Sequence, residues 1–371
     1  MADVHLKHLN YVQMQVQAEP GIIMELSDHF TYYADNYRWH PKFKARIWDG
    51  KIRMLNGMSG VIYSGLAHQI KKFCDSRGYT LSFDKEFLYQ DTTEEELEDF
   101  IKTLNIPDKF SIRDYQFKSI LKCIRSNRRT LLSPTSSGKS LMIYILCRWY
   151  GSKNLIIVPS IGLVRQMEGD FRDYGYEGKI HMSTDGLSKE NDIDADMVIT
   201  TWQSLNNGKR KMPKKWYQQF SSVVGDEAHG CKAVVLMQIL SSLENCKYRF
   251  GTTGTLDGNT LNEMTIQGLF GPTYSAITTK ELIDQGYASK LKIKCIVLKY
   301  PDEVRKASVK QSYHDEVDFL NNHEGRNNFI KNLILSLKGN KLIFFKKNDH
   351  GKLLYDLVSE HSKHTFYITG S

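Results

Sequence analysis

Apolar side chains recur with two different periods in the first part of the chain. Residues 12–16 alternate between apolar side chains and glutamines, which is the period of a strand with one buried face. The segment 20–33 begins with proline and predicts a helix, and 65–78 is an amphipathic helix that ends at a glycine. Residues 79–83 predict a closing strand. We expect a small α+β domain here.

The pattern changes between about residues 106 and 285. Five apolar runs, each of strand length, alternate with helical stretches: 130–133, 154–159, 197–201, 222–227 and 248–255. Strands that are apolar on both faces and separated by helices predict a parallel sheet in an α/β domain. The acidic stretch 91–100, with a helix start at Thr92 or Thr93, is expected to connect this domain to the first.

The same alternation begins again after residue 285. It predicts a helix at 324–337, a strand at 341–345, a helix at 349–362 and a strand at 365–369. We expect domains at 1–95, 96–288 and 289–371, the last being the beginning of a second domain of the same kind.

Composition adds little to this picture. The chain has 371 residues, of which 41% are hydrophobic and 25% charged, and its net charge of +8 permits a polyanionic partner without requiring one. No cysteine pair has the C-x-x-C spacing, so we expect reduced, mostly buried thiols and no zinc site. The cysteines are Cys74, Cys123, Cys147, Cys231, Cys246 and Cys295. No apolar stretch has the length of a membrane span or signal core, which predicts a soluble, intracellular protein.

The segment from Leu131 to Met142, LLSPTSSGKSLM, has the strand–loop–helix context of a phosphate-binding loop. Ser133 stands where the G-x-x-x-x-G-K-[ST] pattern has its first glycine, while Gly138 is present. Backbone N–H groups of such a loop cradle phosphates, the lysine reaches the β- and γ-phosphates, and the hydroxyl ligates magnesium. Lys139 and Ser140 are the candidates. The alternative is a chance serine-rich turn before a helix.

Asp226 and Glu227 end one of the buried strands. In open α/β sheets ligands bind at this edge, and a magnesium-bound triphosphate needs one group to hold the metal and another to orient the attacking water. Asp226 is the metal candidate, with Ser140, and Glu227 the water-orienting one. Taken alone, such a pair could be a solvated turn, but its order after the loop favours a nucleotide site.

These motifs resemble those of superfamily-two DEAH-box helicases. Residues 226–229, Asp-Glu-Ala-His, match their second nucleotide motif, and SPTSSGKS is similar to their A-P-T-x-x-G-K-[ST] loop, which accepts a small residue first. The resemblance implies a RecA-like domain that binds ATP and magnesium. The loop residues it implies at the ATP are Pro134, Thr135, Ser136, Ser137, Gly138, Lys139 and Ser140.

Further stretches occur in the order that this family has them. IRDYQ at 112–116 resembles the adenine motif, with Gln116 at the adenine edge and Arg113 or Tyr115 packing nearby. FGTTGTLDG at 250–258 resembles the motif that couples hydrolysis to strand movement. The coupling residues implied are His229, Thr253, Gly254 and Thr255. Two loops that touch the nucleic-acid backbone in the family are also matched. Their residues here are Pro159, Ser160, Thr201, Trp202 and Gln203.

A basic and aromatic segment at 36–55 suggests a nucleic-acid contact. Basic residues neutralise phosphates, and interleaved aromatic side chains stack on bases. The DNA-contact candidates are Arg38, Trp39, Lys42, Lys44, Arg46, Lys51 and Arg53. The alternative is a solvated basic hairpin whose aromatic residues form its core, and we expect Phe43 and Trp48 to be at least partly buried.

This N-terminal segment closely resembles the UvsW family of recombination helicases from T-even bacteriophages, and the resemblance extends over the whole chain. It rests on Y-R-x-x-P-K-F, W-D-G-K-I-R and Q-I-K-K-F-C-D, and on LKYPDEV at 298–304. It implies a monomeric, ATP-dependent DNA helicase, cytoplasmic in the bacterial host, that remodels branched DNA in recombination, repair and replication. Such work includes branch migration, fork regression and removal of the RNA in R-loops.

The family carries arginines of a second lobe against the γ-phosphate, and the residues up to Ser371 contain neither motif V nor motif VI. An arginine finger accelerates phosphoryl transfer by a factor on the order of a thousand. We therefore expect this chain alone to bind ATP and DNA and to turn over slowly. The alternatives are the motor subunit of a restriction or remodelling complex, and an ATP-regulated DNA-binding module. Absence of an N-K-x-D or L-S-G-G-Q motif disfavours a GTPase or a transporter ATPase.

Overall fold

The computed structural model describes residues 2–151, 153–183, 193–206, 212–232, 234–308, 311–362 and 364–369. The chain divides into two compact units, Met1–Lys290 and Leu291–Ser371, which are described separately. Among its described residues the first unit holds a four-stranded, a seven-stranded and a two-stranded sheet in one compact body, so the predicted boundaries after residues 95 and 288 stay predictions.

The N-terminal part is the predicted α+β domain. Its described residues form a four-stranded sheet in the order β5–β2–β1–β6, where only β1 and β6 are parallel. The strands are β1 Val4–His8, β2 Gln13–Ala18, β5 Val61–Tyr63 and β6 Leu81–Phe83. Helices α1 (Pro20–His29) and α3 (Ala67–Arg77) complete the domain, and α3 ends at Gly78, whose φ of 75° is left-handed. Alternating apolar residues of β1 and β2 supply the core.

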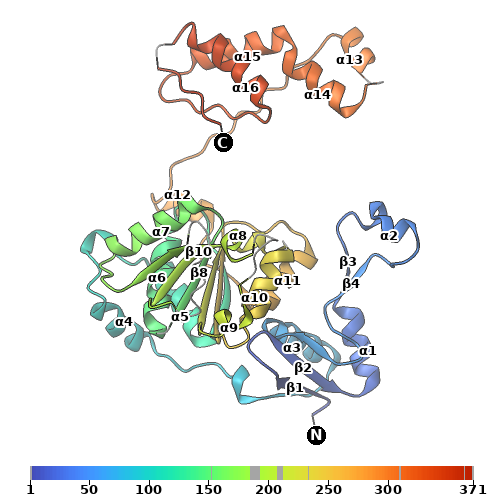
Figure 1. The fold of residues 1–371 in the computed structure, drawn as a ribbon, viewed down its shortest axis with the longest axis vertical. Helices are drawn as coiled ribbons and strands as arrows, with labels where there is room; N and C mark the ends of the chain where they lie inside the picture. The colour runs from blue at the N-terminus through green and yellow to red at the C-terminus, as the bar shows by residue number, and fades with distance from the viewer. Residues whose placement is uncertain are drawn as a thin grey trace. The chain divides into compact units, whose positions relative to one another are not determined.

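A two-stranded arm projects from this domain (Figure 1). Strands β3 (Thr31–Tyr33) and β4 (Lys51–Arg53) pair only with each other, in antiparallel register. The tip between them carries the 3-10 turn η1 (Tyr37–Trp39) and the short helix α2 (Pro41–Lys44). The helix predicted over 20–33 is therefore wrong in its last residues, because α1 ends at His29 and residues 31–33 pair with β4 as a strand.

A parallel sheet forms the second part of the unit, as predicted. Among the described residues it has seven strands in the order β13–β7–β12–β11–β8–β10–β9, all parallel. Five are the predicted ones: β7 Arg128–Leu132, β8 Asn154–Val158, β10 Met197–Thr201, β11 Ser222–Asp226 and β12 Tyr248–Thr253. The two edge strands, β9 (Ile180–Ser183) and β13 (Thr273–Ser275), were not predicted, because neither is a continuous apolar run.

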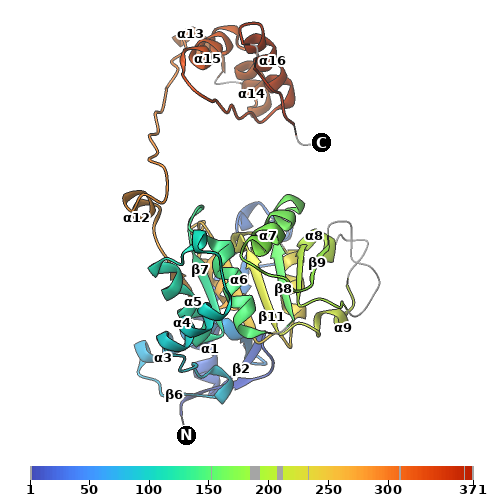
Figure 2. The same ribbon diagram turned by 90° about the vertical axis from the view of Figure 1, so that its left-hand side faces the viewer.

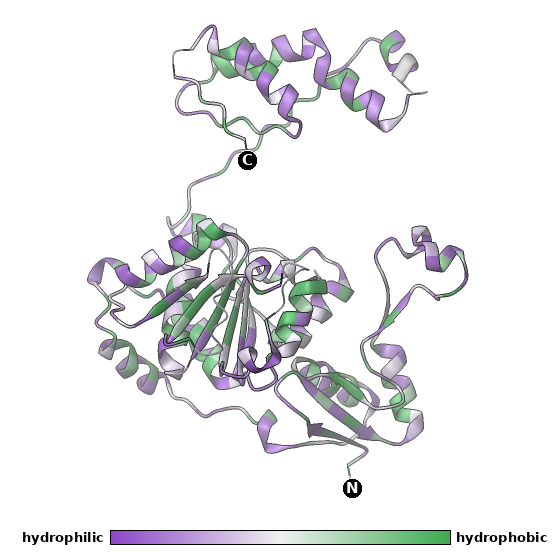
Figure 3. Ribbon diagram, in the orientation of Figure 1, coloured by the Kyte–Doolittle hydropathy of each residue, from purple (hydrophilic) through white to green (hydrophobic). Residues whose placement is uncertain are grey.

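Helices cover both faces of this sheet (Figures 1 and 2). One layer contains α5 Asp114–Ser126, α6 Lys139–Tyr150 and α7 Ile161–Asp173. The other contains α8 Trp202–Leu205, α9 Lys214–Tyr217, α10 Val234–Ser242 and α11 Thr260–Phe270. Within β8, Ile156 and Val158 join the first core, and Leu155 and Ile157 join the second. Figure 3 shows the hydrophobic residues gathered on these central strands.

Two shorter helices border the sheet domain. The predicted connecting helix is α4 (Glu94–Thr103), which begins after Thr93. Thr93 accepts a hydrogen bond from the Glu96 amide, and the Glu96 side chain accepts one from the Thr93 amide, as the capping pattern predicts. Helix α12 (Thr279–Asp284) closes the unit with the same kind of cap.

The seam between the N-terminal domain and the parallel-sheet domain includes a close backbone approach between the 3-10 turn η2 (Ser64–Leu66) and α11, with a polar cluster beside it. A Cβ added to Gly65 would lie 2.1 Å from the Gln267 carbonyl oxygen and 2.5 Å from that of Gly268. The Gln267 side-chain oxygen contacts His68 Nε2 and Gln69 Nε2, both at 2.9 Å. Burial lowers the pKa of His68, which favours the neutral ring in this contact. At Gly65 the two domains therefore contact each other through their backbones, with no side chain between them.

The second unit differs from its prediction. Its helices are α13 Asp302–Ser308, α14 Tyr313–Asn322, α15 Glu324–Ser336 and α16 Asn348–Ser359, and the last two confirm the predicted helices. The predicted strands at 341–345 and 365–369 are wrong, since neither segment is assigned as a strand. They lie side by side through stacked rings of Phe345 and Tyr367, 5.5 Å apart, while Phe344 is 87% exposed. Apolar periodicity marks strand-like segments, but hydrogen bonding to a neighbouring strand is needed to form them.

Two exclusions hold for the described part of the chain. No helix there is long and apolar enough to cross a bilayer. Its cysteines Cys74, Cys123, Cys147 and Cys246 are buried and Cys295 is exposed, which confirms that the described thiols are mostly buried. The side chain of Cys231 lies outside the described part.

The contact at Gly65 gives a stability prediction. Gly65→Ala places a methyl group against two carbonyl oxygens that belong to backbone, so we expect a loss of about 1–3 kcal/mol of stability. The melting temperature should fall by several degrees in a thermal unfolding scan. Gly21→Ala is the matched control, because its Cβ would meet nothing within 4 Å. Equal melting temperatures for the two variants would contradict this account of the seam.

Candidate functional site

The sequence-predicted nucleotide and coupling residues meet at one edge of the parallel sheet. Because all seven described strands are parallel, their carboxyl ends share that edge. The loop at 133–138 leaves β7, Asp226 and Glu227 end β11, and Thr253–Thr255 leave β12. Pro159 and Ser160 follow β8, and Thr201 ends β10. Strands β7, β12 and β11 are direct neighbours, so the first three groups are adjacent.

The loop after β7 has the conformation of a phosphate cradle. Gly138 has φ +76° and Ser136 φ +68°, and α6 begins immediately after, at Lys139. These left-handed residues turn successive amides toward the helix N-terminus, where the helix dipole also favours an anion. A Cβ on Gly138 would lie 2.3 Å from Gln116 Nε2, so only glycine fits.

Ser133 replaces the usual glycine without strain. Its φ is not positive, so no glycine is needed there, and its side chain is fully buried. Its hydroxyl lies 2.6 Å from that of Ser137, and its amide donates to the Thr253 carbonyl at 2.8 Å. Ser133 thus connects the start of the loop to Ser137, near its end, and to β12.

A chain of polar contacts crosses the site. Lys139 Nζ donates to Glu227 Oε1 at 2.7 Å and lies 4.0 Å from Asp226 Oδ1. Glu227 Oε2 is 3.2 Å from His229 Nδ1, which is 2.9 Å from Thr253 Oγ1. The Thr253 hydroxyl donates to the Thr255 carbonyl, so it accepts from the imidazole N–H. Glu227 has a left-handed φ of 52°, a strained backbone of the kind found at functional sites.

The proposed metal ligands are oxygen atoms, as magnesium requires. Asp226 Oδ1 accepts from Thr252 Oγ1 at 2.6 Å, and Ser140 Oγ lies 3.0 Å from Tyr174 OH. The described residues contain no cluster of three or more His, Cys, Asp or Glu suited to a metal. A hydroxyl with one carboxylate nevertheless fits magnesium, which takes its remaining ligands from water and substrate phosphates.

Gln116, on α5, supports the phosphate loop. Its side chain is 2% exposed, its Nε2 donates to the Ser137 carbonyl at 2.9 Å, and its Oε1 accepts from the Arg113 amide. The Tyr115 hydroxyl also donates to the Ser137 carbonyl, at 2.8 Å. The adenine-reading role of Gln116 stays a prediction, because both ends of its amide are engaged by the protein.

Two further backbone loops at this edge have capping roles. Ser160 caps α7 through the Leu163 amide, and Thr201 caps α8 through the Ser204 amide. Pro159, Ser160 and Gln203 are exposed, and Trp202 is half-buried. Thr201 is only 3% exposed, so its side chain positions this loop and is not displayed to a ligand. The predicted contacts of these loops with nucleic acid stay predictions.

The basic residues of the arm lie at its exposed tip, apart from the loops just described. Arg38, Lys42, Lys44 and Arg46 are exposed, and Trp39 is 75% exposed with Lys44 Nζ 5.2 Å from its ring centre. Trp48 and Phe43 are half-buried, as expected.

Two internal contacts shape this tip. The indole N–H of Trp48 donates to the Lys51 carbonyl at 3.0 Å. Arg53 pairs with Asp49 at 2.5 Å and, with Lys51, lowers the pKa of that carboxyl. Arg53 is therefore partly neutralised, unlike the four cations of the tip.

Both sheet domains match known family models. Residues 3–84 match the model for DNA helicase UvsW, N-terminal, and residues 109–258 match that for the Type III restriction enzyme, res subunit. The chain is 32% identical to the ATP-dependent DNA helicase uvsW of Enterobacteria phage T4 over 383 residues, which cover 99% of this chain and 75% of the helicase. The chain belongs to the UvsW family of ATP-dependent DNA helicases.

Other relatives agree with membership of the UvsW family. The DNA 3'-5' translocase XPB2 of Sulfurisphaera tokodaii is 25% identical over 276 residues, covering 74% of this chain and 54% of that protein. Two crystal structures of UvsW from bacteriophage T4 are 32% identical to this chain. The first matches with a TM-score of 0.64, over 74% of this chain and 99% of the UvsW chain in that crystal structure. The second matches with a TM-score of 0.67, over 97% of this chain and 73% of the UvsW chain.

Several residues of the site escaped the sequence reasoning. Tyr287 lies 3.9 Å from the Arg113 guanidinium, measured to the ring centre, and borders the adenine side. Thr252 fixes Asp226, and Tyr174 contacts Ser140. Asp170 also reaches Ser140, and burial raises the pKa of that carboxyl. Tyr174 and Asp170 belong to no motif, whereas Thr252 lies within the matched stretch at 250–258 and could have been selected from it.

Gly138 provides a direct test of the cradle. In Gly138→Ala the new methyl group meets Gln116 and the φ of +76° is unfavourable, at about 1–2 kcal/mol for a residue with a Cβ. We expect ATP affinity, measured by titration of a fluorescent analogue, to fall roughly 5- to 30-fold. The control is Gly78→Ala, which has a matching left-handed φ of +75° and whose new Cβ would meet nothing within 4 Å. Unchanged affinity in Gly138→Ala would refute the assigned cradle.

Proposed function

We propose that this chain hydrolyses ATP at the carboxyl edge of the parallel sheet and uses the energy to remodel branched DNA. The proposed work comprises branch migration of junctions, regression of stalled forks and removal of RNA from R-loops. Membership of the UvsW family supports ATP and DNA as the substrates. The observation that carries the mechanism is the contact chain from Lys139 through Glu227 and His229 to Thr253.

The residues of the cradle would divide the work of binding ATP. Amides of residues 134–138 and Lys139 would hold the phosphates, and Ser140 with Asp226 would hold magnesium, which neutralises charge on the reacting phosphate. Arg113, Tyr115 and Gln116 border the adenine side. The Arg113–Tyr287 stack supports this placement, because a flat cationic and aromatic pair offers a base a surface on which to stack.

Glu227 is the proposed water-orienting residue. In the structure its carboxylate pairs with Lys139. A triphosphate in the cradle would attract Lys139 to its phosphates, and this would free one carboxylate oxygen of Glu227 to orient the attacking water. The other oxygen remains beside His229, which contacts Thr253. A movement of Glu227 during ATP hydrolysis would therefore be transmitted through His229 to Thr253–Thr255, the stretch proposed to couple hydrolysis to strand movement.

The DNA contacts proposed for the chain fall into two groups. Exposed cations of the arm tip would neutralise backbone phosphates, and Trp39 has the exposure needed to stack on a base. The loops after β8 and β10 form the second group, through residues 159–160 and 202–203. We further propose that the protein works as a monomer in the cytoplasm of an infected bacterium.

Glu227→Gln tests the role assigned to the carboxylate. The amide keeps the size of the side chain and its contact with Lys139, so we expect ATP affinity within about threefold of the wild type. It cannot accept a proton, which should slow the reaction. The rate of DNA-stimulated ATP hydrolysis, measured as release of inorganic phosphate, should fall by roughly 10²- to 10⁴-fold. The matched control is Glu98→Gln, on the exposed surface of α4. Wild-type turnover in Glu227→Gln would contradict the proposed role of Glu227.

Neutralising the arm tests the DNA contact. The triple substitution Lys42→Gln, Lys44→Gln and Lys51→Gln should weaken duplex binding and reduce the slope of log K against log salt by about 2 to 3, since each phosphate contact contributes about 0.9. Fluorescence anisotropy with labelled DNA at several salt concentrations gives the slope.

A control triple carries the same change of charge elsewhere in the N-terminal domain. The substituted residues Lys71, Lys72 and Lys85 (each to Gln) are all exposed; the first two lie on α3 and the third begins the 3-10 turn η3 (Lys85–Phe87), after β6. We expect their slope to match the wild type. If both triples behave alike, the arm contributes only net charge and is not a DNA contact.

A further inference from the structure

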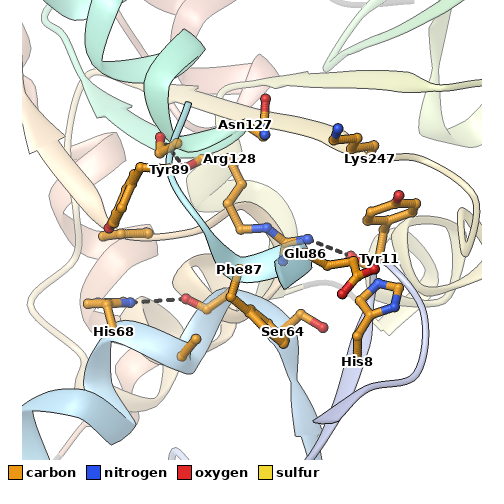
Figure 4. A pocket seen from close by; sticks show the side chains of 14 residues that line it. His8, Tyr11, Ser64, His68, Glu86, Phe87, Tyr89, Asn127, Arg128 and Lys247 are labelled. Atoms are coloured by element: carbon orange, nitrogen blue, oxygen red, sulfur yellow. Dashed lines mark hydrogen bonds between the residues drawn. The ribbon is translucent and has the colours of Figure 1, made fainter. Parts of the chain in front are cut away.

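A pocket lies in the seam between the N-terminal domain and the parallel-sheet domain, away from the nucleotide loops (Figure 4). Its volume is about 70 Å³, enough for several waters or one small oxyanion. His8, Tyr11, Glu86 and Phe87 line it from the N-terminal domain, and Asn127, Arg128 and Lys247 line it from the other.

Three of the residues that line this pocket carry buried polar atoms without partners. Among the described residues, Arg128 Nη1, His8 Nε2 and Asn127 Oδ1 are buried and have no hydrogen-bond partner. Asn127 is 8% exposed, and the two ends of its amide can exchange places, so it offers either an acceptor or a donor. Buried groups of this kind are ordinarily satisfied, and leaving one unpaired costs about 1–3 kcal/mol.

Arg128 is the central group of the pocket. It reaches in from β7, and its Nη2 donates to the Tyr11 carbonyl at 3.0 Å, the bond drawn in Figure 4. Within the described chain no carboxylate forms an ion pair with it. Burial, together with the charge of Arg249, lowers the pKa of Arg128 to about 9, so it remains charged at neutral pH. A buried cation without a counter-charge is unfavourable, and a bound anion would remove that penalty.

The remaining charges also favour an anion. Lys247 supplies a second cation, and Glu86 is the one acid among the described lining residues. Burial lowers the pKa of His8 against the opposing charges of Glu86 and Asp84, so this ring is a neutral partner. The exposed Glu86 opposes a bound anion, and the buried guanidinium atom of Arg128 favours one. The two cations belong to the sheet domain, and Tyr11 and His8 belong to the other, so a bound anion would bridge both.

We propose that this pocket binds one phosphate-class oxyanion, held by Arg128 with Lys247 and His8, and that the anion ties the N-terminal domain to the ATPase domain. The guanidinium fork matches the oxygens of a phosphate. The phosphate is either free inorganic phosphate or a phosphodiester of DNA that passes along the seam. Free phosphate and a DNA phosphodiester would be held by the same side chains. The first would stabilise the folded protein, and the second would stabilise the complex with DNA.

Thermal unfolding in chloride buffer with added inorganic phosphate tests the first source. Lys139→Ala serves as the background, because it removes competing phosphate binding at the nucleotide loop. At tenfold excess over Kd we expect the melting temperature to rise by roughly 2–4 °C. The rise should vanish when Arg128→Met is added, shrink with Lys247→Met, and persist with Arg128→Lys. Lys122→Met, which removes an exposed cation on α5, should leave it intact.

DNA binding tests the second source. If the ligand is a backbone phosphate, Arg128→Met reduces the salt slope of duplex binding by about one and inorganic phosphate has no effect on melting. If the ligand is free phosphate, the slope is unchanged. Either result supports the proposal. The proposal is overturned if phosphate leaves the melting temperature of Lys139→Ala unchanged and the salt slope is the same in the wild type, in Arg128→Met and in Lys247→Met. Lys247→Met leaves every described hydrogen bond of the seam in place, so it also separates loss of the anion from loss of folding.

Discussion

Parallel pairing of the central strands is the constraint on which the other features depend. Because β7, β12, β11, β8 and β10 all run in one direction, five loops that are distant in sequence open at one edge. Strands β8, β10 and β11 contribute apolar side chains to the cores on both faces, and the helices on either side bury them. β7 and β12 also carry buried polar residues, Thr130 and Arg249, away from the edge where the loops open.

The nucleotide edge neutralises itself when it holds no ligand. Lys139 has Glu227 as its close partner, and Glu227 in turn has His229, so no buried charge is left alone. Substrate binding is an exchange of partners, and its energy is the difference between two sets of charge-assisted hydrogen bonds. The seam pocket is organised in the opposite way, because Arg128 has no carboxylate among the described residues.

Sequence patterns predicted the parallel sheet, its five central strands and the helices α1, α3, α4, α15 and α16, because each depends on local periodicity and caps. They also selected Lys139, Asp226, Glu227 and His229, which the fold brings together. They could not show that Gln116 is occupied by the loop, or that Tyr287 lies over Arg113, since both depend on tertiary packing. The strands expected at 341–345 and 365–369 failed because pairing is a property of neighbours and not of the segment.

Gly65 has a consequence for how sequences of this family diverge. At this position two backbones approach so closely that a single methyl group has no space. The requirement concerns the absence of a side chain, which no compensating change on α11 can supply, because the opposing atoms are carbonyl oxygens. A sequence that retains this docking must therefore retain glycine at the corresponding place. One that has lost it must hold its first domain differently, so the residue serves as a diagnostic of domain arrangement.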